Sequence, residues 1–120
     1  MTAQKAVPAT KLRQLLITFE QFRAINPNMP VQTVQTFLYV CEHEDDPEGV
    51  SIKDIAIALE FSHASASRNV AALSSWTRHR KEGPNLLEAQ EDVMHRSHKK
   101  VKLTPAGRRL RDTLMELISK

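Results

Sequence analysis

The sequence is poor in the residues that support disulfide, zinc and membrane structures. Its 120 residues include a single cysteine, Cys41, which excludes an internal disulfide and a zinc site made of several cysteines. No hydrophobic run approaches the ~20 residues of a membrane span, and the N-terminal region lacks the basic-then-apolar pattern of a secretory signal. We therefore expect a cytoplasmic protein that has no membrane partner.

Motifs of catalysis and metal binding are missing too. The chain has neither a glycine-rich phosphate loop nor a nucleophile elbow, so we expect no enzyme and no cofactor. Cys41 with His43, and His95 with His98, are possible ligand pairs, but a structural zinc site needs about four converging ligands. We favour the absence of a metal, and an inert Cys41 thiol whose pKa is raised by neighbouring acidic residues.

The composition indicates one ordinary globular domain over residues 1–120, because 41% of the residues are hydrophobic and 26% are charged. Positive charge is concentrated in one region. Residues 62–111 carry eleven Lys and Arg against four Asp and Glu, whereas residues 1–61 carry five against eight. Such a concentration is typical of proteins that bind an anionic partner, above all nucleic acid, although a solvated basic surface remains the alternative.

Apolar residues at three- and four-residue steps predict a helix over residues 9–25. Prolines within residues 26–30 end this helix, and a second helix extends from Val31 to an acidic turn at 42–49. We assign residues 9–48 to N-terminal helices that support the domain or form a dimer.

Two capping patterns predict the next pair of helices. Ser51 and Asp54 form a capping box that starts a third helix, after a short strand over residues 50–52. Ser62 is the expected N-cap of a fourth helix. The buried face of this fourth helix is expected to contain Ala66, Val70 and Leu73.

Two short strands and one more helix complete the expected fold. Residues 86–89 and 100–103 can pair as a hairpin, and Thr104 caps the last helix. The order of helix, tight turn, helix, hairpin and helix is that of a winged helix-turn-helix. We therefore predict a mainly α fold with a small β-hairpin wing (α+β), in which a core at 49–104 is flanked by the N-terminal helices and by a C-terminal helix at 105–120.

The segments IKDIAIALEFSHASASRNVAAL and HRSHKKVKLTPAGRRL resemble the multiple-antibiotic-resistance regulator (MarR) family of bacterial transcription factors. Ser67-Arg68 matches a serine-arginine step in the family's recognition helix, and Leu103-Thr104-Pro105-Ala106-Gly107 matches the element that opens its next helix. Arg96 falls on the first wing arginine, whereas His95 and Ser97 depart from the family's acidic residue and second arginine. The resemblance implies a dimeric DNA-binding protein whose wing arginine enters the minor groove.

The fourth helix and the hairpin are the predicted binding elements for double-stranded DNA. Small polar side chains let a helix approach the major groove closely, while hydroxyls, arginine and helix N-termini hold phosphates or base edges. We predict a recognition helix at about 62–76 that contacts DNA through Ser62, His63, Ser65, Ser67, Arg68 and Asn69. A wing at about 86–103 is expected to hold the DNA through Arg96, Lys99 and Lys100, with Arg78 and Arg80 as further backbone contacts.

Both ends of the chain carry more apolar residues than a winged core needs. They recur at Leu12, Leu15, Phe19 and Phe22, and again at Leu110, Leu114 and Leu117. We hypothesise a homodimer that represses transcription by occupying a pseudo-palindromic promoter site. The alternatives are a winged-helix protein of replication or packaging, and a protein-interaction module that docks through its acidic turn. A small-molecule effector has no support in the sequence.

Overall fold

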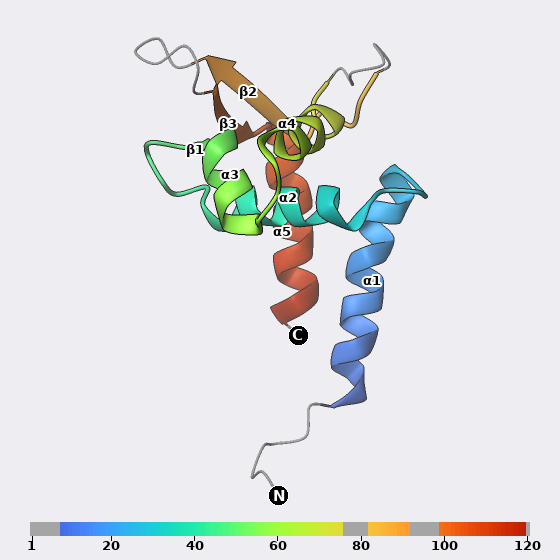
Figure 1. The fold of residues 1–120 in the computed structure, drawn as a ribbon. Helices are drawn as coiled ribbons and strands as arrows, with labels where there is room; N and C mark the ends of the chain where they lie inside the picture. Colours follow the sequence, from blue (N-terminus) through green and yellow to red (C-terminus); the bar gives the residue numbers. More distant parts are fainter. Residues whose placement is uncertain (1–7, 76–81, 92–98, 120) are drawn as a thin grey trace, which may run out of the picture.

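The chain folds into a head of helices and a small sheet, from which two further helices project (Figure 1). The computed structural model describes residues 8–75, 82–91 and 99–119. In chain order the elements are α1 (Ala9–Ile25), α2 (Val31–Glu42), β1 (Val50–Ser51), α3 (Ile52–Leu59), α4 (His63–Ala72), β2 (Leu87–Glu91), β3 (Lys99–Leu103) and α5 (Pro105–Ser119). The predicted winged helix-turn-helix, mainly α with a small sheet, is confirmed. Among the described helices, none is both long and apolar enough to cross a membrane.

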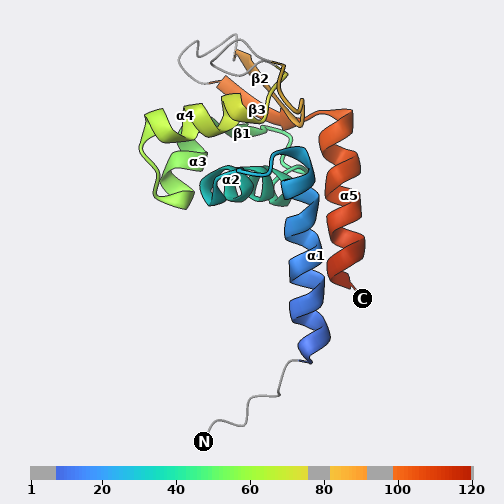
Figure 2. The ribbon, with the colours of Figure 1, turned by 90° about the vertical axis from the view of Figure 1, so that its right-hand side faces the viewer.

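The two projecting helices, α1 and α5, lie side by side and run in opposite directions (Figure 2). Both extend away from α4 and the sheet, so that α1 begins and α5 ends at the far end of the molecule. Most apolar residues of α1 remain exposed in the single chain, including Leu12 at 68%, whereas Phe22 is 2% exposed. The projecting pair therefore presents apolar surface that the head does not cover.

The local capping predictions for α3 and α4 are confirmed. Ser51 Oγ accepts a hydrogen bond from the Asp54 N–H at 3.0 Å, and the Asp54 carboxylate accepts one from the Ser51 N–H at 3.0 Å. These hydrogen bonds favour the ionised carboxylate and hold the pKa of Asp54 below its usual value. Ser62 Oγ accepts a hydrogen bond from the Ser65 N–H, also at 3.0 Å, at the start of α4.

The sheet has three antiparallel strands in the order β1-β3-β2. Val101 in the central strand lies opposite Val50 on one side and Ala89 on the other. The predicted hairpin is confirmed with slightly longer strands, and the short strand before α3 joins it as the third member of the sheet. The wing is thereby paired with the residues that start the helix-turn-helix.

The core lies where α2, α3, α4 and the sheet meet. Its largest fully buried side chains include Phe37, Ile55, Leu73, Leu87 and Leu103, which come from these different elements. The ring of Phe22 in α1 packs edge-on against Phe37, with 5.8 Å between the ring centroids. The head is therefore one packed unit, to which the end of α1 is attached.

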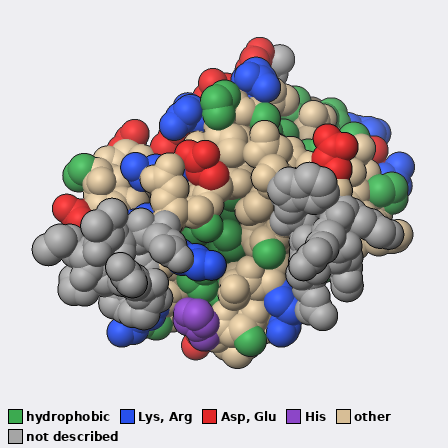
Figure 3. Space-filling model, turned by 90° about the horizontal axis from the view of Figure 1, so that it is seen from above, with side chains coloured by type: hydrophobic (Ala, Val, Ile, Leu, Met, Phe, Trp, Pro, Cys, Tyr) green, Lys and Arg blue, Asp and Glu red, His purple; other side chains and the backbone are tan. Residues whose placement is uncertain are grey.

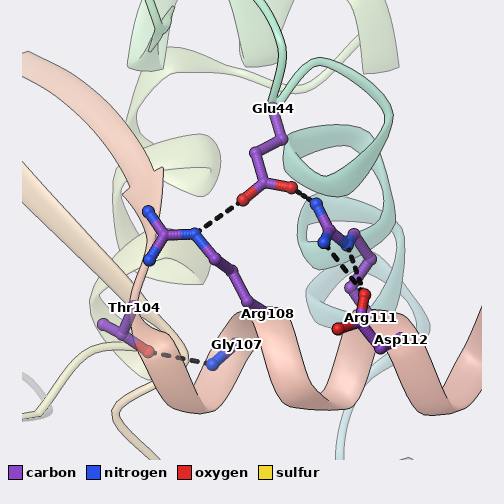
Figure 4. A network of polar contacts seen from close by, with 6 residues as sticks. All are labelled: Glu44, Thr104, Gly107, Arg108, Arg111 and Asp112. Atoms are coloured by element: carbon purple, nitrogen blue, oxygen red, sulfur yellow. Dashed lines mark hydrogen bonds and ion pairs between the residues drawn. The ribbon is translucent and has the colours of Figure 1, made fainter.

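The base of the wing is joined closely to the start of α5. Thr104 Oγ1 donates a hydrogen bond to the Asn85 carbonyl at 2.6 Å and accepts one from the Gly107 N–H at 3.0 Å, which confirms Thr104 as the cap (Figure 4). A Cβ atom on Gly107 would lie 2.1 Å from the Leu86 carbonyl oxygen. Glycine is required here because any side chain would separate the helix from the wing.

Candidate nucleic-acid interface

The packing of α4 decides which of its residues face outward. Ala66, Val70 and Leu73 are buried against the head, which confirms the predicted apolar face. Arg68 is exposed on the other side of the helix, and His63 is exposed at its first position. The outward face of α4 is therefore made of small and polar side chains with one guanidinium group, as the sequence predicts.

The N-terminal turn of α4 is suited to bind anions. Ser62 and His63 are exposed and Ser65 is half-buried, so this end of the helix is open to a partner. The first N–H groups of a helix have no partner within the helix, and the helix dipole places partial positive charge at this end. Arg68 adds a full positive charge one turn later, where its Nη2 donates a hydrogen bond to Ser65 Oγ at 3.0 Å.

Asn69 is the predicted contact residue that the structure places elsewhere. Its side chain is 9% exposed, and its Oδ1 accepts a hydrogen bond from Thr33 Oγ1 of α2 at 2.8 Å. The reason is helical periodicity, because Asn69 falls on the same face as the buried Ala66 and Leu73. Asn69 connects α4 to α2 and is not on the outward face.

The two predicted lysines of the wing lie on opposite faces of the sheet. Lys99 lines a hollow between α4 and the sheet, together with Ser67, Ser75 and Glu88. Lys100 lies beside Gly49, on the other side of β3, because side chains alternate along a strand. The structure therefore brings Lys99, but not Lys100, close to the outward face of α4.

Figure 3 shows the molecule from above, where Lys and Arg side chains and a His are visible between the two segments that are not described. Ser75, at the rim of the hollow, is a candidate contact that the sequence reasoning missed. No helical pattern marks it in the sequence, because Ser75 lies beyond the end of α4 at Ala72. The predicted contacts Arg78, Arg80 and Arg96 lie outside the described residues.

The end of α4 is hydrogen-bonded to the beginning of the wing. The Leu86 N–H donates to the Leu73 carbonyl at 2.7 Å, and the Gly83 N–H donates to the Ser75 carbonyl, also at 2.7 Å. These bonds use carbonyl groups that a helix end leaves without partners. The recognition helix and the wing are thus held together as one surface.

Cys41 has the raised pKa that the sequence predicts, but for a different reason. Burial in the head raises the pKa of its thiol to about 12, while the nearby Arg111 acts in the lowering direction. The neighbouring acidic residues were expected to be the cause, and that part of the interpretation is wrong. Within residues 8–75, 82–91 and 99–119, no group of three His, Cys, Asp or Glu side chains is arranged to hold a metal ion.

The fold and the surface of α4 define the chain as a winged helix-turn-helix protein, and comparisons with solved structures agree. The chain is similar to the Staphylococcus aureus protein MepR in its complex with DNA, with 21% identity, a TM-score of 0.65, and coverage of 92% of this chain and 77% of that one. It is also similar to a structure described as MepR, a transcription regulator of the Staphylococcus aureus multidrug efflux pump MepA, with 18% identity, a TM-score of 0.62, and coverage of 92% and 71%. No family model matches the sequence, and no curated protein matches it. At this identity the likeness shows a shared fold.

Proposed function

We propose that this protein is a sequence-specific, double-stranded DNA-binding transcription regulator and not an enzyme. The observation that carries the proposal is the surface of α4, where Ser62, His63 and Arg68 are exposed and where Ser67 and Lys99 line one hollow between the helix and the sheet. A helix with small polar residues and one arginine can enter the major groove, while the wing contacts the backbone. The same fold occurs in a complex of MepR with DNA, which supports DNA binding by this chain.

The contacts divide into two kinds. Arg68 is long enough to reach a guanine edge in the major groove, so it reads sequence. Ser62, Ser65 and Ser67 bind phosphates or bring the helix backbone close to the bases, and Lys99 binds the DNA backbone without reading sequence. Arg78, Arg80 and Arg96 remain proposed contacts of the DNA backbone and the minor groove.

A homodimer is part of the proposal. The exposed apolar residues of α1 and α5, including Leu12, Leu16 and Met115, offer a surface that a second copy can cover. Two-fold symmetry would place two α4 helices in successive major grooves, about 10 base pairs apart, and would match a pseudo-palindromic site. A dimer that occupies such a site within a promoter excludes polymerase, so we propose repression as the outcome.

The experiment that tests this function is enrichment of genomic and random duplex fragments by the purified protein at near-physiological salt. Recovery of one recurring pseudo-palindrome, with affinity that falls steeply as salt rises, is the expected result. Retention of fragments with no shared sequence would point to a replication or packaging role. No retention at any salt concentration would overturn DNA binding and favour a protein-interaction module.

A further inference from the structure

One carboxylate ties α5 to the turn that follows α2. Glu44 Oε1 accepts a hydrogen bond from Arg108 Nε at 2.8 Å, and Glu44 Oε2 pairs with a guanidinium nitrogen of Arg111 (Figure 4). Arg111 also donates to Asp112 from Nε and Nη2, at 3.1 and 2.9 Å. The Glu44 and Arg111 side chains are 17% and 29% exposed, so water and salt screen their pair less than a surface ion pair, whereas Arg108 is 51% exposed.

Glu44 stands on a turn that is itself fixed to the head. Within this turn, the Gly49 N–H donates to the Asp46 carbonyl and the Glu48 N–H donates to the Asp46 carboxylate, both at 2.9 Å. The next residue, Val50, belongs to β1 and is paired with β3. Glu44 is therefore connected to the sheet of the head through a hydrogen-bonded turn.

The remaining contacts of α5 beyond its first turn are mainly apolar. Leu114 is buried and Leu110 is half-buried, and the helix lies beside α1. Apolar contacts are not directional, whereas charge-assisted hydrogen bonds to a guanidinium group fix geometry. Without the charge of Glu44, Arg108 would lose the carboxylate it bonds to, and Arg111 would keep only its pair with Asp112 on the same helix.

We propose that Glu44 is the positioning residue that fixes the direction of α5 relative to the head, and thereby the separation of the two α4 helices in a dimer. The second part rests on the proposed function. In a two-fold dimer built on α1 and α5, the angle between α5 and the head sets the half-site spacing that both recognition helices can occupy.

The first test measures the geometry within one protomer and needs no DNA. Spin labels are attached at Ala58→Cys in α3 and Ser119→Cys in α5, in a Cys41→Ser background, and the labelled chain is diluted into unlabelled protein. The distance distribution between the labels is expected to broaden or shift in Glu44→Gln, and to stay unchanged in the control Glu48→Gln, which removes a charge from the same turn. An identical distribution in Glu44→Gln and the parent would overturn the proposal.

A second variant keeps this test decisive if Glu44→Gln does not fold. Arg108→Gln removes one partner and leaves the pair between Glu44 and Arg111 in place. It is expected to give a smaller change of the same kind, while its thermal melting shows that the chain is folded. A folded Arg108→Gln protein with the parent's distance distribution would count against the role of Glu44.

The second test measures DNA affinity against half-site spacing. The parent is expected to bind one spacing most tightly. Glu44→Gln is expected to reduce the ratio of affinities for the preferred and the other spacings about fivefold or more, which is the lower end of the couplings usual between two sites. Its affinity for an isolated half-site should stay unchanged, which a general loss of structure would not allow. An unaltered preference would overturn the spacing role. If the parent binds no specific DNA, the proposed function fails, and the label distances still decide whether Glu44 positions α5.

Discussion

Thr33 in α2 donates a hydrogen bond from its Oγ1 to Oδ1 of Asn69 in α4 at 2.8 Å, and both side chains are buried. The two residues are 36 positions apart in the chain, so this bond fixes the rotation of α4 about its own axis relative to α2. Arg68 is the residue before Asn69 and is exposed. Holding Asn69 inward is therefore what directs Arg68 outward.

Asn69→Ala should lower the free energy of unfolding by about 1–3 kcal/mol, because it leaves the Thr33 hydroxyl buried without its partner. Urea denaturation measures this loss. Thr33→Val removes the other partner, and the double variant should lose less than the sum of the two single losses. Strictly additive losses would show that the two side chains do not act together.

Arg68→Ala and Lys99→Ala should weaken DNA binding in different ways. Arg68→Ala is expected to cost about 1–3 kcal/mol on the preferred site and to relax sequence preference, because a base contact is lost. Lys99→Ala is expected to weaken all sequences alike and to reduce the slope of log affinity on log salt by about 1, because a phosphate contact is lost. Binding assays on the preferred and a scrambled site, over a range of salt, separate the two.

Arg13→Ala is the charge-matched control for these two variants. Arg13 is exposed on α1, which projects away from α4, so its removal should leave both the affinity and the sequence preference almost unchanged. If Arg68→Ala loses equal affinity on matched and scrambled sites, Arg68 does not read bases.

Gly107→Ala should lower stability by about 1–3 kcal/mol, because the added methyl group meets the Leu86 carbonyl oxygen, which belongs to the backbone and cannot rotate away. Thermal and urea denaturation measure the change. Gly49→Ala is an informative comparison, since its Cβ has room, with no neighbour nearer than 3.7 Å, but its φ of +73° is strained for alanine. That strain costs about 1–2 kcal/mol. A Gly107→Ala protein as stable as the parent would contradict the close approach of α5 to the wing.

Leu16→Glu should convert the proposed dimer into a monomer, because it places a charge in the exposed apolar surface of α1. Sedimentation analysis over a range of concentrations detects the change. Ile57→Glu is the control, since Ile57 is equally apolar and 68% exposed but lies on α3 in the head. Dissociation by both substitutions, or by neither, would place the interface somewhere other than on α1.

Cys41 should react slowly with thiol reagents in the folded protein. Burial raises the pKa of the thiol from its ordinary value of 9.0 to about 12, which strongly lowers the thiolate fraction near pH 8. Alkylation with and without denaturant measures this difference. The raised pKa also makes stability depend on pH. Because the thiol ionises at a lower pH in the unfolded chain than in the folded protein, the free energy of unfolding falls as pH rises from about 9 toward 12. Equal alkylation rates would contradict the burial of Cys41.

The elements that local sequence determines were predicted well. The capping box of Ser51 and Asp54, the cap at Ser62 and the cap at Thr104 depend on residues within three positions of each other. Such contacts form as soon as the helix forms, and their residue types are distinctive. The winged helix-turn-helix follows from these elements and from the hairpin pattern.

Contacts between distant residues were not predictable in the same way. Glu44 and Arg108 are 64 positions apart, and nothing in the acidic turn distinguishes Glu44 from its neighbours until α5 is placed beside it. Asn69 could have been assigned correctly, because its spacing from Ala66 and Leu73 puts it on the buried face. The small polar residues of the helix favour an outward position for Asn69, whereas helical periodicity correctly places it on the buried face.

The antiparallel pairing of α1 and α5 has a practical consequence for handling the molecule. Because α1 begins and α5 ends at the end opposite α4 and the sheet, additions at either end of the chain are carried away from the face proposed to bind DNA. They are brought instead to the exposed apolar surface of the projecting helices. A bulky fluorescent or immobilisation tag at either end should therefore interfere with self-association before it interferes with capture of a duplex.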